Sequence, residues 1–231
     1  MHRRRITWLL AVCLAFAAGV VVGARGPDED PPVAERPPPE TVERGPAPVP
    51  RAPAILWRAS RSIGTPTDGR LVRAVHLPVE GEDFVTWHPV RDAIPNASWR
   101  RYGSARLVRT LLRVLRAHRA AHPEAPRLVV GDLSRPRGGD FGVRYGGIGH
   151  STHQNGLDAD VYLPRRDGRL RPPLRVTQVD RERTQDLVDR FVAAGAESIF
   201  VSRRLRLRGP RDVVQHWPRH GDHLHIRLPR A

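Results

Sequence analysis

The N-terminal stretch limits what this chain can fold into, because it separates an apolar leader from everything that follows. Basic residues at positions 3–5 precede an almost unbroken apolar run from Ile6 to Ala24. This layout is typical of a secretory signal, and the run is also close to the ~20 residues that span a bilayer. We expect residues 1–25 to be a signal peptide or an N-terminal membrane anchor. The remainder is then exported, to the periplasm or another extracytoplasmic space.

Residues 26–54 are rich in proline and charge and have no apolar periodicity, which predicts a flexible, extended tether. The only cysteine, Cys13, lies in the apolar run. The exported part can therefore form neither an internal disulfide nor a thiolate metal site. We expect residues 55–231 to be one domain, in which histidine and carboxylate side chains are the metal ligands available.

The charge of the chain bears on its partners. The formal net charge is +15, and all 39 residues counted as lysine or arginine are arginines. A lysine-free composition rich in alanine, proline and glycine indicates a GC-rich genome, so the arginine count alone does not identify a partner. The net charge still favours polyanions. For an exported protein these are acidic cell-wall polymers rather than nucleic acid, and membrane contact is expected only through an uncleaved N-terminal segment.

From residue 55 on, short strand-like segments alternate with two amphipathic helices. Ser104 is the expected N-cap of a helix that ends before Pro123, and Gly195 is expected to end a helix that begins at Asp180. Strands are expected within residues 70–78, 82–89, 127–134, 157–164, 198–202 and 223–229. The pattern predicts an α+β domain with a mostly antiparallel central sheet and flanking helices.

One expected strand, residues 157–163, carries two carboxylates on a single face. Asp158 and Asp160 alternate there with apolar residues, and His153 stands before them across an Asn-Gly turn. Buried carboxylates destabilise a fold unless they have a partner, and a divalent cation is such a partner.

A second group of histidines lies near the C-terminus, in the stretch RHGDHLHIRLP. In a strand, His223 and His225 point to one face, about 6–7 Å apart along the backbone. One of them would bind a metal and the other would reach the metal-bound water. With His153 and Asp160 this gives three protein ligands and an open position, as in catalytic zinc sites.

The motifs GHSTHQNGLDADVYL and HGDHLHIRL resemble those of the penicillin-insensitive murein endopeptidases. This family belongs to a group of zinc peptidases with D-Ala-D-Ala carboxypeptidases, lysostaphin-type enzymes and hedgehog-like domains. The stretches SIGTPTDGRLVRAVHLP, RRYGSARLVRTLLRVL and LVVGDLSRPRGG resemble the N-terminal half of the family, in the same order. The resemblance covers most of residues 62–228 and implies a zinc domain of the hedgehog and D-Ala-D-Ala-peptidase type.

The resemblance also implies roles for individual residues. One Zn²⁺ per domain would be held by His153, Asp160 and His225, with His223 as the catalytic histidine near the zinc-bound water. The remaining residues of the two motifs would be a further catalytic histidine, His220, and groups that orient ligands or contact substrate, namely His150, Asp222 and Asp158. For Asp158, a structural hydrogen bond in the turn is an equal alternative.

The implied function is that of a zinc-dependent DD-endopeptidase, which hydrolyses D-Ala–diaminopimelate cross-links in peptidoglycan during cell-wall remodelling. Two alternatives stay open. A D,D-carboxypeptidase or dipeptidase would use the same site on stem ends, and a non-catalytic wall-binding domain would keep zinc for structure. Some members of the family carry several disulfides, whereas this exported domain has none, so we expect its loops to be held by packing alone.

Overall fold

The computed structural model describes residues 54–142 and 151–230. The expected leader, nearly all of the tether, and His150 lie outside the described residues. Within the described ranges, no helix has both the length and the apolar character needed to cross a membrane.

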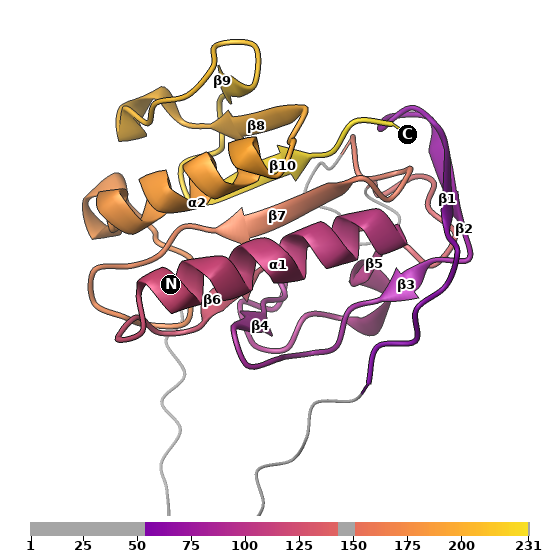
Figure 1. Ribbon diagram of the computed structural model, residues 1–231, viewed down its shortest axis with the longest axis horizontal. Coiled ribbons are helices and arrows are strands. Elements are labelled where there is room, and N and C mark those ends of the chain that lie inside the picture. Colours follow the sequence, from indigo (N-terminus) through magenta and orange to yellow (C-terminus); the bar gives the residue numbers. More distant parts are fainter. Residues whose placement is uncertain (1–53, 143–150, 231) are drawn as a thin grey trace, which may run out of the picture. The chain divides into compact units, whose positions relative to one another are not determined.

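A six-stranded sheet forms the centre of the domain (Figure 1). In spatial order its strands are β4 (Phe84–Thr86), β6 (Leu128–Val130), β7 (Asp158–Tyr162), β10 (His223–Arg227), β8 (Ser198–Val201) and β9 (Val214–His216). Two small sheets flank it, and they pair β1 (Arg61–Gly64) with β2 (Gly69–Val72) and β3 (Val75–His76) with β5 (Tyr102–Gly103). Short 3-10 turns are η1 (Ser98–Arg100), η3 (Val176–Gln178) and η4 (Arg203–Leu205).

The central sheet is mixed, so the prediction of a mostly antiparallel sheet needs correction at both edges. The inner pairs β6–β7, β7–β10 and β10–β8 are antiparallel, whereas the outer pairs β4–β6 and β8–β9 are parallel. Between β4 and β6 the chain crosses over through α1, and a crossover returns the next strand in the same direction. The α+β class is as predicted.

Helix α1 begins after the cap that the sequence predicts, and Asp180, the predicted first residue of the second helix, is its N-cap. In α1 (Ala105–Ala121), the Ser104 side chain accepts a hydrogen bond from the Leu107 N–H at 3.1 Å. In α2 (Arg181–Ala193), the Asp180 carboxylate accepts one from the Arg183 N–H at 3.1 Å. These bonds satisfy backbone donors that the first helical turn leaves unpaired. Gly195 follows α2 with a φ of +80°, as expected of a glycine after a helix.

Helices α1 and α2 cover one face of the sheet, and the main core lies between them and the strands (Figure 1). Leu157, just before β7, and Ala159 and Val161 on β7 pack into this core, and on β10, Leu224 and Ile226 do the same. Because side chains alternate along a strand, the neighbouring positions on β7 and β10 must face the other side of the sheet. Those positions carry the aspartates and histidines singled out above.

Some elements differ from the sequence expectation. The strand expected at residues 70–78 is interrupted at Arg73, whose φ of +51° ends β2 before β3 begins. The short strands β1, β5 and β9 were not expected, since two to four residues are too few to show a periodic pattern.

Candidate metal centre

His153, Asp160 and His225 lie together on the sheet face opposite the helices. Each offers one ligand atom, and these three atoms lie within 4.8 Å of one another. Oδ1 of Asp160 is 3.5 Å from Nε2 of His153 and 3.2 Å from Nδ1 of His225. Ligand atoms about 2.0–2.1 Å from a tetrahedral zinc ion are separated by about 3.3 Å. The spacing of the three side chains therefore fits a tetrahedral cation.

The pairing of β7 with β10 brings two of these ligands together. In the antiparallel register, His225 lies directly opposite Asp160, and Arg227 lies opposite Asp158. A shift of one residue would turn either side chain to the helix-covered face. Because Leu224 and Ile226 are buried in the core on that face, the hydrophobic packing also fixes the register of the metal ligands.

His153 reaches the site from the turn before β7. Its φ of +72° is uncommon for a residue with a side chain, and such backbone strain is often found at functional positions. The Nδ1–H of its ring donates to the Leu133 carbonyl at 2.5 Å. This bond fixes the tautomer, so the lone pair is on Nε2, which faces Asp160.

His225 is oriented by a second carboxylate. Its Nε2–H donates to Oδ1 of Asp158 at 2.8 Å, which leaves Nδ1 as the atom that faces Asp160. Arg227 donates to the same Asp158 oxygen at 2.7 Å, and the Asp158 side chain is fully buried. Carboxylates that hold the far side of a metal-binding histidine fix its tautomer and orientation. Asp158 thus bonds a candidate ligand rather than the turn that was its structural alternative.

The electrostatics of the group favour positive charge between the three side chains. Burial alone would raise the pKa of Asp160, but the nearby His153 and His223 rings outweigh burial and hold that pKa well below its ordinary value. Burial would likewise lower the pKa of His225, but its hydrogen bonds with Asp158 and Asp160 outweigh burial and raise that pKa. A buried carboxylate that stays ionised is suited to bind a cation.

His223 and Asp222 lie beside the three ligands. Nε2 of His223 is 3.8 Å from Oδ1 of Asp160, and its Nδ1–H donates to the Asp222 carboxylate at 2.7 Å. The side chain of His223 is 15% exposed and that of Asp222 is 43% exposed, whereas the three ligands are buried. His223 therefore stands between the buried group and solvent.

The ring of His220 lies next to that of His223, on the side of the site that faces solvent. Its centroid is 4.8 Å from that of His223 and 6.0 Å from that of His225, and its Nδ1–H donates to the Pro218 carbonyl at 2.8 Å. Burial, followed by the charge of His223, lowers the pKa of His220. Of the eight site residues named from the sequence, the structure brings seven together, and His150 lies outside the described residues.

A buried polar network behind Asp160 was not foreseen from the sequence. Arg100 and Asp132 form a fully buried ion pair, and Asn96 donates to the Asp132 carboxylate at 2.9 Å. The Asp160 N–H donates to the Asp132 carbonyl at 2.9 Å. Gly131 leaves room for this approach, because a Cβ there would lie 3.0 Å from that of Asp160. The available signal was an aspartate two residues after the apolar strand β6, but its partners lie more than 30 residues away.

The sequence model of the family described as penicillin-insensitive murein endopeptidase matches residues 62–199, more than half of the chain. This chain belongs to that family. The match includes His153 and Asp160 but ends before His223 and His225. For this member of the murein endopeptidase family, strand β10 therefore supplies the third candidate ligand from outside the matched range.

Curated penicillin-insensitive murein endopeptidases are similar to this chain. That of Haemophilus influenzae is 35% identical over 101 residues, which cover 44% of this chain and 30% of the relative. That of Salmonella heidelberg is 27% identical over 197 residues, which cover 74% of this chain and 66% of the relative. The chain thus spans between about one third and two thirds of the length of these murein endopeptidases.

Proposed function

We propose that this protein is a zinc-dependent DD-endopeptidase that hydrolyses D-Ala–diaminopimelate cross-links in peptidoglycan. The observation that carries the proposal is the convergence of His153, Asp160 and His225 at tetrahedral spacing beneath the partly exposed His223. Membership of the murein endopeptidase family supports both the reaction and the substrate class. We place the domain among the zinc peptidases of the hedgehog and D-Ala-D-Ala-peptidase type.

The residues present fit one zinc ion. Two neutral imidazole nitrogens and one carboxylate oxygen are a donor set typical of catalytic zinc, which leaves a position for water or substrate. When bound, zinc supplies a water of lowered pKa and a Lewis acid for the scissile carbonyl. His153 and His225 would ligate through Nε2 and Nδ1, the atoms that face Asp160.

His223 is the proposed proton carrier. Because its Nδ1–H is held by Asp222, the neutral ring has its lone pair on Nε2, which points toward the ligand group. That atom is placed to take a proton from the attacking water and to return it to the leaving amine. His220, whose ring lies next to it, is the second proposed catalytic histidine, and it contributes positive charge or a hydrogen bond at the open side.

The test uses the full chain, loaded with zinc, and purified cross-linked muropeptide dimers, with products identified by mass spectrometry. We expect conversion of dimers to monomers, abolished by a chelator, restored by zinc and absent in His225→Ala. The matched control is His216→Ala, an exposed histidine on β9 that lies outside the site. Loss of a terminal D-Ala with dimers intact would identify a D,D-carboxypeptidase. Stoichiometric zinc without any cleavage would identify a wall-binding domain.

Export and attachment are part of the proposal. We propose that residues 1–25 direct export or anchor the chain, and that residues 26–54 are a tether that lets the domain at 55–231 reach the wall. An enzyme of the family acts on the cell wall, which implies export. Fractionation of cells that express the full chain, followed by mass determination of its N-terminus, tests these assignments.

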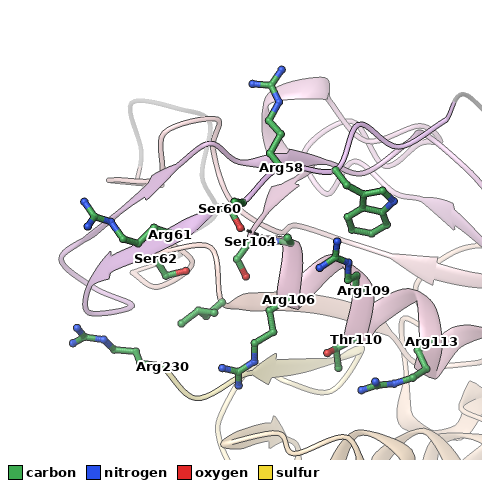
Figure 2. A pocket seen from close by; sticks show the side chains of 14 residues that line it. Arg58, Ser60, Arg61, Ser62, Ser104, Arg106, Arg109, Thr110, Arg113 and Arg230 are labelled. Atoms are coloured by element: carbon green, nitrogen blue, oxygen red, sulfur yellow. Dashed lines mark hydrogen bonds between the residues drawn. The ribbon is translucent and has the colours of Figure 1, made fainter.

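We also propose that the domain binds anionic wall polymers through an arginine-lined groove of about 730 Å³ at the start of α1 (Figure 2). None of the residues that line this groove is acidic. Exposed Trp57 adds an aromatic wall and stacks on the Arg109 guanidinium at 4.7 Å. The arginines of the groove are Arg58, Arg61, Arg106, Arg109, Arg113 and Arg230. Such a surface suits phosphate or carboxylate groups repeated along a polymer.

The groove is tested by co-sedimentation of the full chain with purified sacculi at increasing salt. We expect glutamine at Arg106, Arg109 and Arg113 together to weaken binding at low salt while cleavage of soluble dimers is unchanged. The matched control places glutamine at three exposed arginines outside the groove, Arg203, Arg204 and Arg211. Equal loss in both triple variants would mean that net charge, not the groove, binds the wall.

A further inference from the structure

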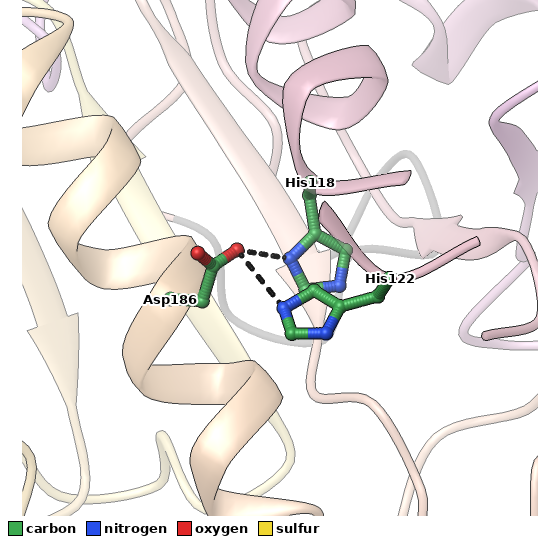
Figure 3. Close-up of side chains that lie close together, drawn as sticks. All are labelled: His118, His122 and Asp186. Carbon is green, nitrogen blue, oxygen red and sulfur yellow. Dashed lines mark hydrogen bonds and ion pairs between the residues drawn. The ribbon is translucent and has the colours of Figure 1, made fainter. Parts of the chain in front are cut away.

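A second group of metal-ligand side chains lies in the helix layer, away from the candidate catalytic centre. His118 and His122 are one helical turn apart at the C-terminal end of α1, and Asp186 faces them from α2 (Figure 3). Each residue offers one ligand atom, and the three atoms lie within 4.8 Å of one another. Among the described residues, this group and the candidate catalytic centre are the two that have this property.

The distances suit a metal ion. Oδ2 of Asp186 is 2.6 Å from Nδ1 of His118 and 3.5 Å from Nε2 of His122. The second distance already matches the separation of about 3.3 Å between ligands of a tetrahedral zinc ion, and the first would need to lengthen by less than about 1 Å. His118 lies in the last turn of α1 and His122, four positions on, is its C-cap, so both side chains come from the same helix end, where their ring centroids lie 4.6 Å apart.

The group leaves one ring nitrogen that a metal would use. Nε2 of His122, which faces Asp186 at 3.5 Å, is buried and makes no hydrogen bond. The His118 side chain is fully buried, whereas His122 and Asp186 are 21% and 25% exposed, which gives an ion a path from solvent. The C-terminal end of a helix attracts positive charge, so the end of α1 favours a cation here.

We propose that His118, His122 and Asp186 bind a second zinc ion, which clamps the C-terminal end of α1 to α2. The clamp has no part in the proposed hydrolysis. It provides a cross-link between elements in a domain that has no cysteine with which to form a disulfide.

A charged neighbour lowers the affinity of this group for a metal. Arg190, one turn along α2, donates to the same Asp186 oxygen at 2.7 Å and therefore competes with a metal for it. Burial lowers the pKa of His118, although its hydrogen bond with Asp186 opposes this effect. We therefore expect the clamp to bind zinc more weakly than the catalytic centre does.

The test is the number of zinc ions that the full chain retains after equilibrium dialysis against zinc at pH 7.5, measured by elemental mass spectrometry. We expect two per chain in the native sequence and one per chain in His122→Ala, Asp186→Asn and His225→Ala. The double variant His122→Ala/His225→Ala should retain none. His216→Ala controls for an exposed histidine outside both groups and should retain two. One ion in the native chain that His122→Ala does not remove would overturn the proposal.

A stability measurement separates loss of the site from loss of the fold. In the His225→Ala background, zinc should raise the melting temperature by several degrees, because a ligand that binds only the folded state stabilises it. We expect this rise to disappear in His122→Gln/His225→Ala, while the melting temperature without zinc changes little. An equal rise in both proteins would show that zinc acts elsewhere and would refute the clamp.

Discussion

The two groups of two histidines and one aspartate share a composition, but their surroundings differ. In the candidate catalytic centre, both ligand histidines have a partner on the far ring nitrogen, the Leu133 carbonyl for His153 and Asp158 for His225. In the helix clamp, the buried Nε2 of His118 has no partner, and Arg190 shares the single carboxylate.

These surroundings give the two groups opposite electrostatics. Two carboxylates raise the pKa of His225 despite its burial, whereas burial prevails at His118 and lowers its pKa. The comparison teaches that ligand type and spacing identify a metal site, while the groups behind the ligands set its affinity and chemistry. The candidate catalytic centre also has His223 beside Asp160, with Nε2 3.8 Å from the Asp160 Oδ1.

The largest expected effect separates chemistry from metal binding. His223→Gln should lower kcat for dimer cleavage by about 10²–10⁴-fold, since it removes the proton carrier but none of the three ligands. The chain should still retain two zinc ions, as measured by elemental mass spectrometry. If His223→Gln instead loses a zinc ion, His223 is itself a ligand and the assignment of His225 must be revised.

A smaller effect is expected at the carboxylate behind His225. Asp158→Asn should weaken zinc binding at the catalytic centre by about 10–100-fold, because the amide holds the ring less firmly in the required tautomer. Competition with a chelator measures this affinity, and the clamp should be unaffected. Asp212→Asn, at an exposed position after η4, is the control. Equal affinity in both variants would mean that Asp158 serves the fold alone.

The sequence predicts the catalytic centre better than the clamp, and the reason is physical. Asp158 and Asp160 interrupt an apolar strand, and His223 and His225 show strand alternation, so local patterns reveal all four. His118 lies on a helix whose periodicity it does not disturb, His122 is the C-cap of that helix, and their partner Asp186 is more than 60 residues away. Helix packing brings that partner near, and no local pattern encodes it.

In the fold as well, features set by local contacts are predicted from the sequence, and features set by distant contacts are not. The cap Ser104 acts within one turn of α1, so it is predicted correctly from the sequence. The parallel pairs β4–β6 and β8–β9 depend on how the chain crosses over, which short strands do not specify. The ion pair of Arg100 with Asp132 joins residues 32 positions apart and was missed for that reason.

Removal of the Arg190 guanidinium, which competes with a metal for Asp186, should make the clamp more like the candidate catalytic centre. In Arg190→Gln, the Asp186 oxygen loses its charged donor, so the affinity of the clamp for zinc should rise several-fold. Isothermal titration in the His225→Ala background measures the change, with Arg203→Gln as an exposed control on η4. A lower affinity in Arg190→Gln would show that Arg190 orients the carboxylate instead of competing for it.

His88 extends the comparison to a buried histidine that is not a ligand in either group. Its Nδ1 accepts hydrogen bonds from the N–H groups of Val90 and Arg91 at 3.2 and 3.3 Å, so its lone pair is already used to form a turn. Burial, followed by the charges of Arg100 and Arg91, lowers its pKa below the ordinary 6.5, although Asp132 opposes the shift. The unfolded chain therefore binds the proton more readily than the folded one.

The sign of the pH dependence follows from this difference. The stability that neutral His88 contributes is fully present above pH 6.5 and is lost as the pH falls through and below that value. Between pH 7.5 and 5.5, the native chain should lose roughly 2–4 °C more in melting temperature than His88→Asn does. Asparagine offers an oxygen to the same two N–H groups but does not titrate, and all other histidines are common to both proteins. Equal decreases in melting temperature in the two proteins would mean that the turn tolerates a protonated His88. A hydrogen-bonded lone pair would then not be enough to distinguish a structural histidine from a metal ligand.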